Sequence, residues 1–176
     1  MKVNLVTAIA VASLVLLAAP LHAASMPKVG DAAPPFTGQD QNGKTINLAD
    51  LIGKKIVLLY FYPKAFTPGC TKEACGFRDR MAGLRKDNVE VLGVSFDTVA
   101  RQEKFTERNK LNFPLIGDPD GKIAALYGVR MGFMHMDHRV SFLIGLNGKI
   151  IHVTDSPDPE VHFEQMKAAI AALAKK

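Results

Sequence analysis

Hydrophobic positions divide the chain into short segments that predict alternating strands and helices. The strongest run, 56–62, holds seven apolar or aromatic residues rich in β-formers and is followed by Pro63, so its length and composition favour a buried strand. From Cys70 to Leu84 the apolar positions recur at steps of three and four, which is the period of an amphipathic helix. Prolines and a glycine within 63–69 predict the turn between them.

The remaining elements follow from the same periods and from turn and cap signals. Strands are predicted at 88–96, 111–116, 140–146 and 149–153, and helices at 99–110, 122–127 and from Pro159 onward with Asp158 as its cap. Asn-Gly pairs predict two β-hairpins, 36–48 and 140–153. The order strand, helix, strand over 56–96 is that of a right-handed parallel crossover. Together these elements predict an α/β fold, a mixed sheet with helices on both faces.

The N-terminal segment predicts export. Lys2 is followed by an apolar run over 3–19, then Pro20 and small residues, an order typical of a secretory signal peptide. A membrane anchor is the alternative, because the run is at the short limit for crossing a bilayer. We expect a signal peptide at 1–23 and a single domain over 24–176. The expected location is the bacterial periplasm, with no membrane attachment after cleavage.

The charge of the chain narrows the classes of function that it can have. Lysine and arginine number 22 against 17 acidic residues, a net charge of +5. No concentrated basic run occurs outside Lys175 and Lys176, so nucleic-acid binding is not supported. The expected chemistry needs no metal and no organic cofactor.

The two cysteines, Cys70 and Cys75, are the centre of the expected chemistry. Cys70 falls in the first turn of its predicted helix, where unpaired N–H groups and the helix dipole stabilise an anion and make a thiol a better nucleophile. In an intact helix, five residues give a rise of about 7.5 Å and an offset of about 140°, so a disulfide requires the first turns to unwind. A bond closing so small a loop would stabilise little. The pair therefore indicates redox cycling.

These residues resemble a known family. Pro63, Thr67 and Cys70 fit the pattern P-x-x-x-T-x-x-C, and FYPKAFTPGCTKEACGFRD closely resembles the active-site segment of peroxiredoxins. Cys75, five residues on, resembles the second cysteine of the Q-type subgroup, also called bacterioferritin comigratory protein. The resemblance implies a thioredoxin-like fold with an N-terminal β-hairpin extension. It also implies reduction of hydrogen peroxide and organic hydroperoxides.

The resemblance also implies roles for individual residues. Cys70 is the expected peroxidatic nucleophile and Cys75 the resolving cysteine, while the Thr67 hydroxyl holds the peroxide and Pro63 shields the thiolate. Arg139, in HRVSFLI, matches the family's arginine, which would favour the thiolate and donate hydrogen bonds to a peroxide oxygen. Without the motif, Arg139 would be interpreted as an exposed strand-end residue. The implied partner is a thioredoxin-like or other dithiol reductant, and a monomer and a weak homodimer are both compatible with an internal resolving cysteine.

Two other functions share this fold. An exported thiol-disulfide oxidoreductase would normally carry C-x-x-C, and a copper-binding thioredoxin-like chaperone would carry C-x-x-x-C with a distant histidine. Neither spacing is that of Cys70 and Cys75, and neither function needs Thr67 and Arg139.

A methionine- and histidine-rich loop precedes Arg139. It contains Met131, Met134, His135, Met136 and His138. Thioether and imidazole ligands suit copper, and thioethers suit Cu(I) in particular. The favoured interpretation is a flexible apolar loop near the active site or at a subunit contact, because methionine adapts to irregular surfaces.

Overall fold

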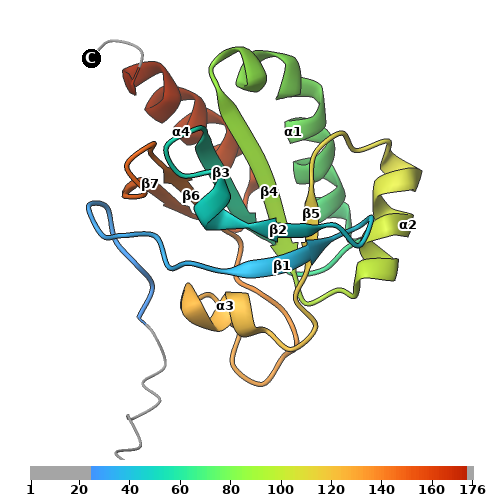
Figure 1. The fold of residues 1–176 in the computed structure, drawn as a ribbon. Coiled ribbons are helices and arrows are strands. Elements are labelled where there is room, and N and C mark those ends of the chain that lie inside the picture. Colours follow the sequence, from blue (N-terminus) through green and yellow to red (C-terminus); the bar gives the residue numbers. More distant parts are fainter. Residues whose placement is uncertain (1–24, 174–176) are drawn as a thin grey trace, which may run out of the picture.

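The computed structural model describes residues 25–173, which form one seven-stranded sheet with helices on both faces (Figure 1). The predicted signal peptide, 1–23, lies outside the described residues. The strand order is β2-β1-β5-β4-β3-β6-β7. The strands are β1 (Thr37–Asp40), β2 (Thr45–Asn47), β3 (Ile56–Phe61), β4 (Val89–Ser95), β5 (Leu115–Gly117), β6 (Val140–Ile144) and β7 (Ile150–Asp155). The helices are α1 (Pro68–Lys86), α2 (Val99–Asn109), α3 (Lys122–Leu126) and α4 (Pro159–Leu173), with a 3-10 turn, η1, at Leu48–Asp50.

Strand β3 lies at the centre of the fold. It pairs in parallel with β4 and antiparallel with β6, which makes the sheet mixed. Because side chains alternate along a strand, Leu58 and Tyr60 join the core beneath α1, α2 and α4, while Leu59 and Phe61 join the core on the α3 side. Both faces of β3 are therefore buried, as its continuous apolar run predicts.

Local signals explain the ends of several elements. The hairpin β1–β2 turns at Gly43, whose φ of 74° favours glycine. The Asn47 side chain accepts a hydrogen bond from the Ala49 N–H at the start of η1. At the start of α4, Asp158 accepts a hydrogen bond from the Glu160 N–H. The Asp158 cap and the N-terminal hairpin are where the sequence predicts them.

Strand β5 is shorter than predicted. It spans Leu115–Gly117, whereas the sequence predicts a strand over 111–116. Pro114, directly before the strand, has no N–H to give to a neighbouring strand. In the segment before Pro114, side chains rather than a neighbouring strand bind the backbone. Arg85 donates to the Asn112 carbonyl (2.6 Å) and Gln41 donates to the Phe113 carbonyl (3.5 Å).

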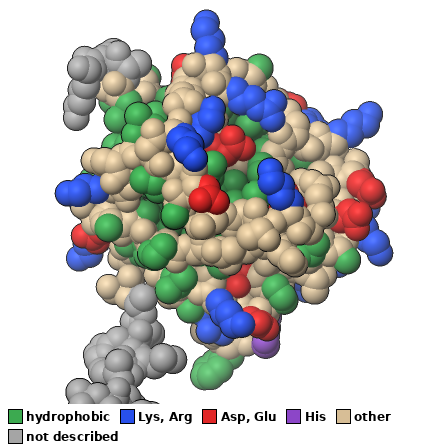
Figure 2. Space-filling view, in the orientation of Figure 1, with side chains coloured by type: hydrophobic (Ala, Val, Ile, Leu, Met, Phe, Trp, Pro, Cys, Tyr) green, Lys and Arg blue, Asp and Glu red, His purple; other side chains and the backbone are tan. Residues whose placement is uncertain are grey.

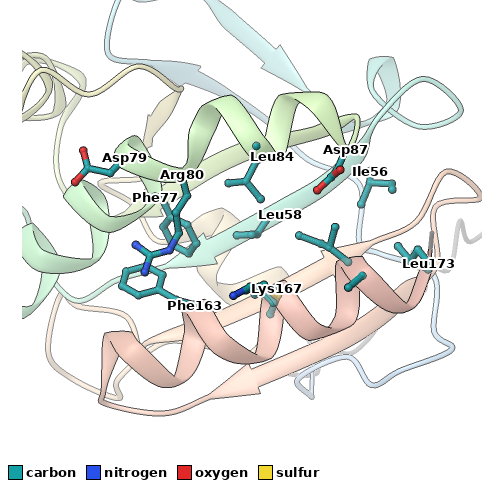
Figure 3. A pocket seen from close by; sticks show the side chains of 14 residues that line it. Ile56, Leu58, Phe77, Asp79, Arg80, Leu84, Asp87, Phe163, Lys167 and Leu173 are labelled. Atoms are coloured by element: carbon teal, nitrogen blue, oxygen red, sulfur yellow. The ribbon is translucent and has the colours of Figure 1, made fainter. Parts of the chain in front are cut away.

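A groove of about 870 Å³ runs between α1 and α4 (Figure 3). Leu58, Phe77 and Phe163 lie along it, with Arg80 and Lys167 at its rim. Its lining does not include Cys70 or Arg139, so it is separate from the site that the sequence predicts. Within 25–173, no helix is both long enough and apolar enough to span a membrane.

Candidate active site

The loop between β3 and α1 is held in place by β4 and α2. The Ala65 N–H donates to Asp97 Oδ2 (2.7 Å), and Arg101 both pairs with Asp97 (2.7 Å) and donates to the Ala65 carbonyl (3.2 Å). Phe66 has a φ of 69°, an unfavourable value for a residue with a side chain. Its ring packs edge-on against Phe105, with centroids 5.1 Å apart. These contacts fix the direction in which the chain enters α1.

Cys70 lies in the first turn of α1, at the carboxyl end of the central strand. The helix begins at Pro68 with Thr67 as its N-cap, and a proline there sets the helical φ without losing a backbone bond. The Thr67 hydroxyl donates to the Lys64 carbonyl (3.0 Å) and does not cap the helix. The Thr67 side chain therefore accepts no hydrogen bond from the first-turn N–H groups. Their partial positive charge lies at the end of the helix that contains Cys70.

Arg139, directly before β6, reaches the cysteine across the sheet. Its Nη2 donates to Cys70 Sγ (3.4 Å) and its Nε to the Pro157 carbonyl (3.1 Å). Burial lowers the pKa of Arg139, but the negative charges of Glu73 and Cys70 outweigh burial and leave that pKa raised. A Cβ at Gly69 would lie 3.2 Å from Nη2, so glycine permits the close approach. The result is a fixed cation against the sulfur.

Glu73 completes this arrangement, and the sequence analysis missed it. The side chain is fully buried on α1, three residues after Cys70, and its Oε2 accepts a hydrogen bond from Arg139 Nη1. Burial raises the pKa of Glu73 to about 8, against the opposing effect of the Arg139 guanidinium. Glu73 therefore holds Nη1, while Nε and Nη2 of the same guanidinium bind Pro157 and Cys70. The available signal was a charged residue on a helix face that is otherwise apolar.

His162, on α4, lies near Glu73 but does not neutralise it. Its Nε2 is 2.9 Å from the Ser156 carbonyl and therefore donates to it, so in the neutral ring Nδ1 accepts from the Ser141 hydroxyl (2.7 Å). Burial lowers the pKa of His162, which keeps the ring neutral near pH 7. The distance from His162 Nδ1 to Glu73 Oε1 is 3.9 Å. Arg139 is thus the cation that compensates the buried acid.

Cys75 and Pro63 make no side-chain hydrogen bond to Cys70, Arg139 or Glu73 in the described residues. Both cysteines are free thiols. Cys75 is half-buried on α1, and its thiol donates to Asn109 Oδ1 on α2 over 3.9 Å. Pro63 is half-buried and opens the loop after β3. The structure therefore brings Cys70 and Arg139 together and holds Cys75 in the helix, oriented toward α2.

The described residues offer no conventional metal site. Across 25–173, no group of three or more histidine, cysteine, aspartate or glutamate side chains is placed to hold an ion. What the cluster provides is a nucleophilic sulfur, a fixed cation 3.4 Å away and uncapped N–H groups. This combination favours attack by sulfur on a substrate that leaves with negative charge.

Comparison with known proteins identifies the fold and the chemistry. A family model described as the AhpC/TSA family matches residues 29–153. Peroxiredoxin Bcp of Escherichia coli K12 is 48% identical over 134 residues, which cover 73% of this chain and 85% of that protein. A putative peroxiredoxin of Mycobacterium tuberculosis H37Rv is 35% identical over 150 residues, covering 83% and 97% of the two chains.

Solved structures agree with these relatives. The crystal structure of peroxidoxin BcpB from M. tuberculosis has a TM-score of 0.77 at 36% identity, covering 82% of this chain and 97% of that one. Peroxiredoxin Q of Xanthomonas campestris has a TM-score of 0.72 at 26% identity, covering 78% and 90%. The predicted thioredoxin-like fold is confirmed, and so is the resemblance to Q-type peroxiredoxins. The chain belongs to the AhpC/TSA family and is a peroxiredoxin of the Bcp and Q type, a thiol-dependent peroxidase.

Proposed function

We propose that the chain reduces hydrogen peroxide and organic hydroperoxides by a cycle that begins at Cys70. The Cys70 thiolate attacks one peroxide oxygen, the O–O bond breaks, and the leaving oxygen takes a proton to become water or an alcohol. Sulfur is oxidised to the sulfenic acid and the peroxide is reduced. The observation that carries the proposal is the Arg139 Nη2 donor 3.4 Å from Cys70 Sγ in the first turn of α1.

The substrate range is part of this proposal. The X. campestris bacterioferritin comigratory protein, a structural neighbour with a TM-score of 0.72, has alkyl peroxide reduction activity. Arg139 and the first-turn N–H groups would stabilise charge on either an alkoxide or a hydroxide leaving group. Thr67 would orient the peroxide from the start of α1, and Pro63 would shield the sulfur.

Cys75 is the proposed resolving residue. Its thiolate attacks the sulfenic sulfur of Cys70, forming a disulfide and releasing hydroxide, which is protonated to water. An external dithiol, such as a thioredoxin-like protein, then reduces the disulfide by exchange. Because both cysteines lie in α1, resolution requires the helix to unwind between them.

The site of action is proposed to be the periplasm, after removal of 1–23. The support is the order of Lys2, the apolar run 3–19 and the small residues after Pro20. Expression of the full chain in a Gram-negative host, followed by fractionation and N-terminal sequencing, tests the proposal. A mature start at Ala24 or Ser25 in the periplasmic fraction is the expected result. An intact Met1 in the cytosol would overturn it.

Single-turnover kinetics tests the cycle. The reduced chain is mixed with one equivalent of peroxide, and the oxidation states of Cys70 and Cys75 are followed by quenching and mass spectrometry. Wild type should pass through the sulfenic acid to the disulfide. Cys75→Ser should stop at the sulfenic acid with an unchanged first step, and Cys70→Ser should consume no peroxide. Full turnover by Cys70→Ser would contradict the proposal.

A further inference from the structure

The methionines of the loop 131–138 are not part of the hydrophobic core. The two core clusters and the side chains packed against them include Met81, Met166 and Met26, but none of the loop methionines. Met134 is 52% exposed, and its neighbour Phe133 is fully exposed. Figure 2 shows hydrophobic side chains and a histidine projecting at the lower edge, where Figure 1 places the loop between α3 and β6. Core packing therefore does not explain why the loop is rich in methionine.

The backbone brings the loop methionines to one end of a small hairpin. Arg130 and Asp137 form an antiparallel bridge that closes the loop. The Met131 N–H then donates to the Met136 carbonyl (3.0 Å), and the Met134 N–H donates to the Met131 carbonyl (3.0 Å). Met131 and Met136 thus lie opposite each other, where cross-strand side chains share a face, and Met134 lies in the turn that joins them.

We propose that this loop binds one Cu(I) ion through the thioether sulfurs of Met131, Met134 and Met136. Thioethers are soft ligands that select Cu(I) over zinc and magnesium. Methionine has three rotatable bonds, so the sulfurs can converge on one ion while the hydrogen bonds of the hairpin are kept. The ligands reach solvent, which gives copper direct access, and binding requires neither cysteine.

Equilibrium dialysis against Cu(I) without oxygen, with ascorbate and with acetonitrile as a weak competing ligand, tests the site. Thiolates also bind Cu(I), so the measurement uses the full chain with Cys70→Ser and Cys75→Ser. The loop variant replaces Met131, Met134 and Met136 with leucine, which preserves size and apolar character. Met26→Leu, which removes a half-buried thioether outside the loop, is the matched control. Circular dichroism verifies that all variants are folded.

The thiol-free chain and the Met26→Leu control should each retain one copper per chain. The loop variant should bind more than about tenfold more weakly, because its only thioether ligands are gone. Ag(I), a redox-inert probe, should shift the methyl NMR signals of the three loop methionines but not those of Met81 and Met166. No retention by the thiol-free chain, or equal retention by the loop variant, overturns the proposal. So does a loop variant that changes only self-association, since the loop would then be a subunit contact.

Discussion

Replacement of Glu73 by glutamine isolates the effect of one buried ionisable group beside the reactive cysteine. Glu73 is fully buried, its Oε2 binds Arg139, and its Oε1 has no hydrogen-bond partner. Glutamine has nearly the same size and keeps an oxygen that can accept from Arg139. The variant therefore removes the ionisable group and leaves the shape of the site.

The pKa of Glu73 fixes the sign of the effect on stability. Burial raises that pKa from 4.5 to about 8. Between these values the folded chain keeps a proton that the unfolded chain has released, so the stability due to this group falls as pH rises. It is fully present below about 4.5 and lost above about 8. Relative to Glu73→Gln, wild type should lose on the order of 3 kcal/mol between about pH 5 and about pH 8.

Urea unfolding of both proteins across this pH range, with the thiols kept reduced, measures the difference. The advantage of Glu73→Gln should grow with pH and level off above about pH 8. A difference that stays constant with pH would show that Glu73 titrates in its ordinary range, and the reasoning from burial would be wrong. Above about pH 8, where Glu73 is ionised, the second-order rate of Cys70 with peroxide should be about five- to tenfold lower in Glu73→Gln, because a charge-assisted bond that orients Arg139 becomes a neutral one.

Three further substitutions test the site and its helix. Arg139→Met should lower the rate of Cys70 with peroxide by roughly 100- to 1000-fold, the usual effect of losing a hydrogen-bond donor to developing charge. An unchanged rate in stopped-flow kinetics would show that Arg139 does not contact the reacting atoms. Gly83→Ala should raise the free energy of unfolding by about 0.5–1 kcal/mol, because a Cβ there meets nothing within 4 Å. Gly76→Ala should lower the free energy of unfolding, since its Cβ would collide with the Phe163 ring. Urea unfolding that finds Gly76→Ala more stable than Gly83→Ala would contradict this packing.

Local signals predicted most elements of the fold. Strand β3, helix α1 and the hairpin at Gly43 follow from apolar period, prolines and an Asn-Gly turn, all of which act over a few residues. Strand β5 begins four residues later than predicted. The apolar residues Leu111 and Phe113 indicated a buried segment, and both are buried, but burial alone does not show which backbone groups are paired. The pairing of β1 with β5 depends on packing between distant segments, which no local pattern reports.

The site was predictable only in part for the same reason. Cys70 was placed in its helical turn by local period, whereas Arg139 lies 69 residues away and was linked to it only through the family motif. Glu73 was overlooked because the search for an amphipathic face counted apolar positions. A buried acid breaks that pattern, and its compensating cation is on another element, so its position becomes meaningful only when Arg139 is seen against it.

Glu73 also connects the two steps of the proposed cycle. It lies between Cys70 and Cys75 on α1, so a helix that unwinds to bring the cysteines together must also withdraw Glu73 from Arg139. Once in water, the carboxyl group recovers its ordinary pKa, and the unwound state releases a proton that the folded state holds below about pH 8. Rising pH should therefore favour unwinding and accelerate disulfide formation more in wild type than in Glu73→Gln. Quenched-flow measurement of the disulfide step in both proteins gives a ratio of rates in which any pH dependence that the two proteins share cancels. A ratio independent of pH would show that Glu73 does not control the opening of the helix.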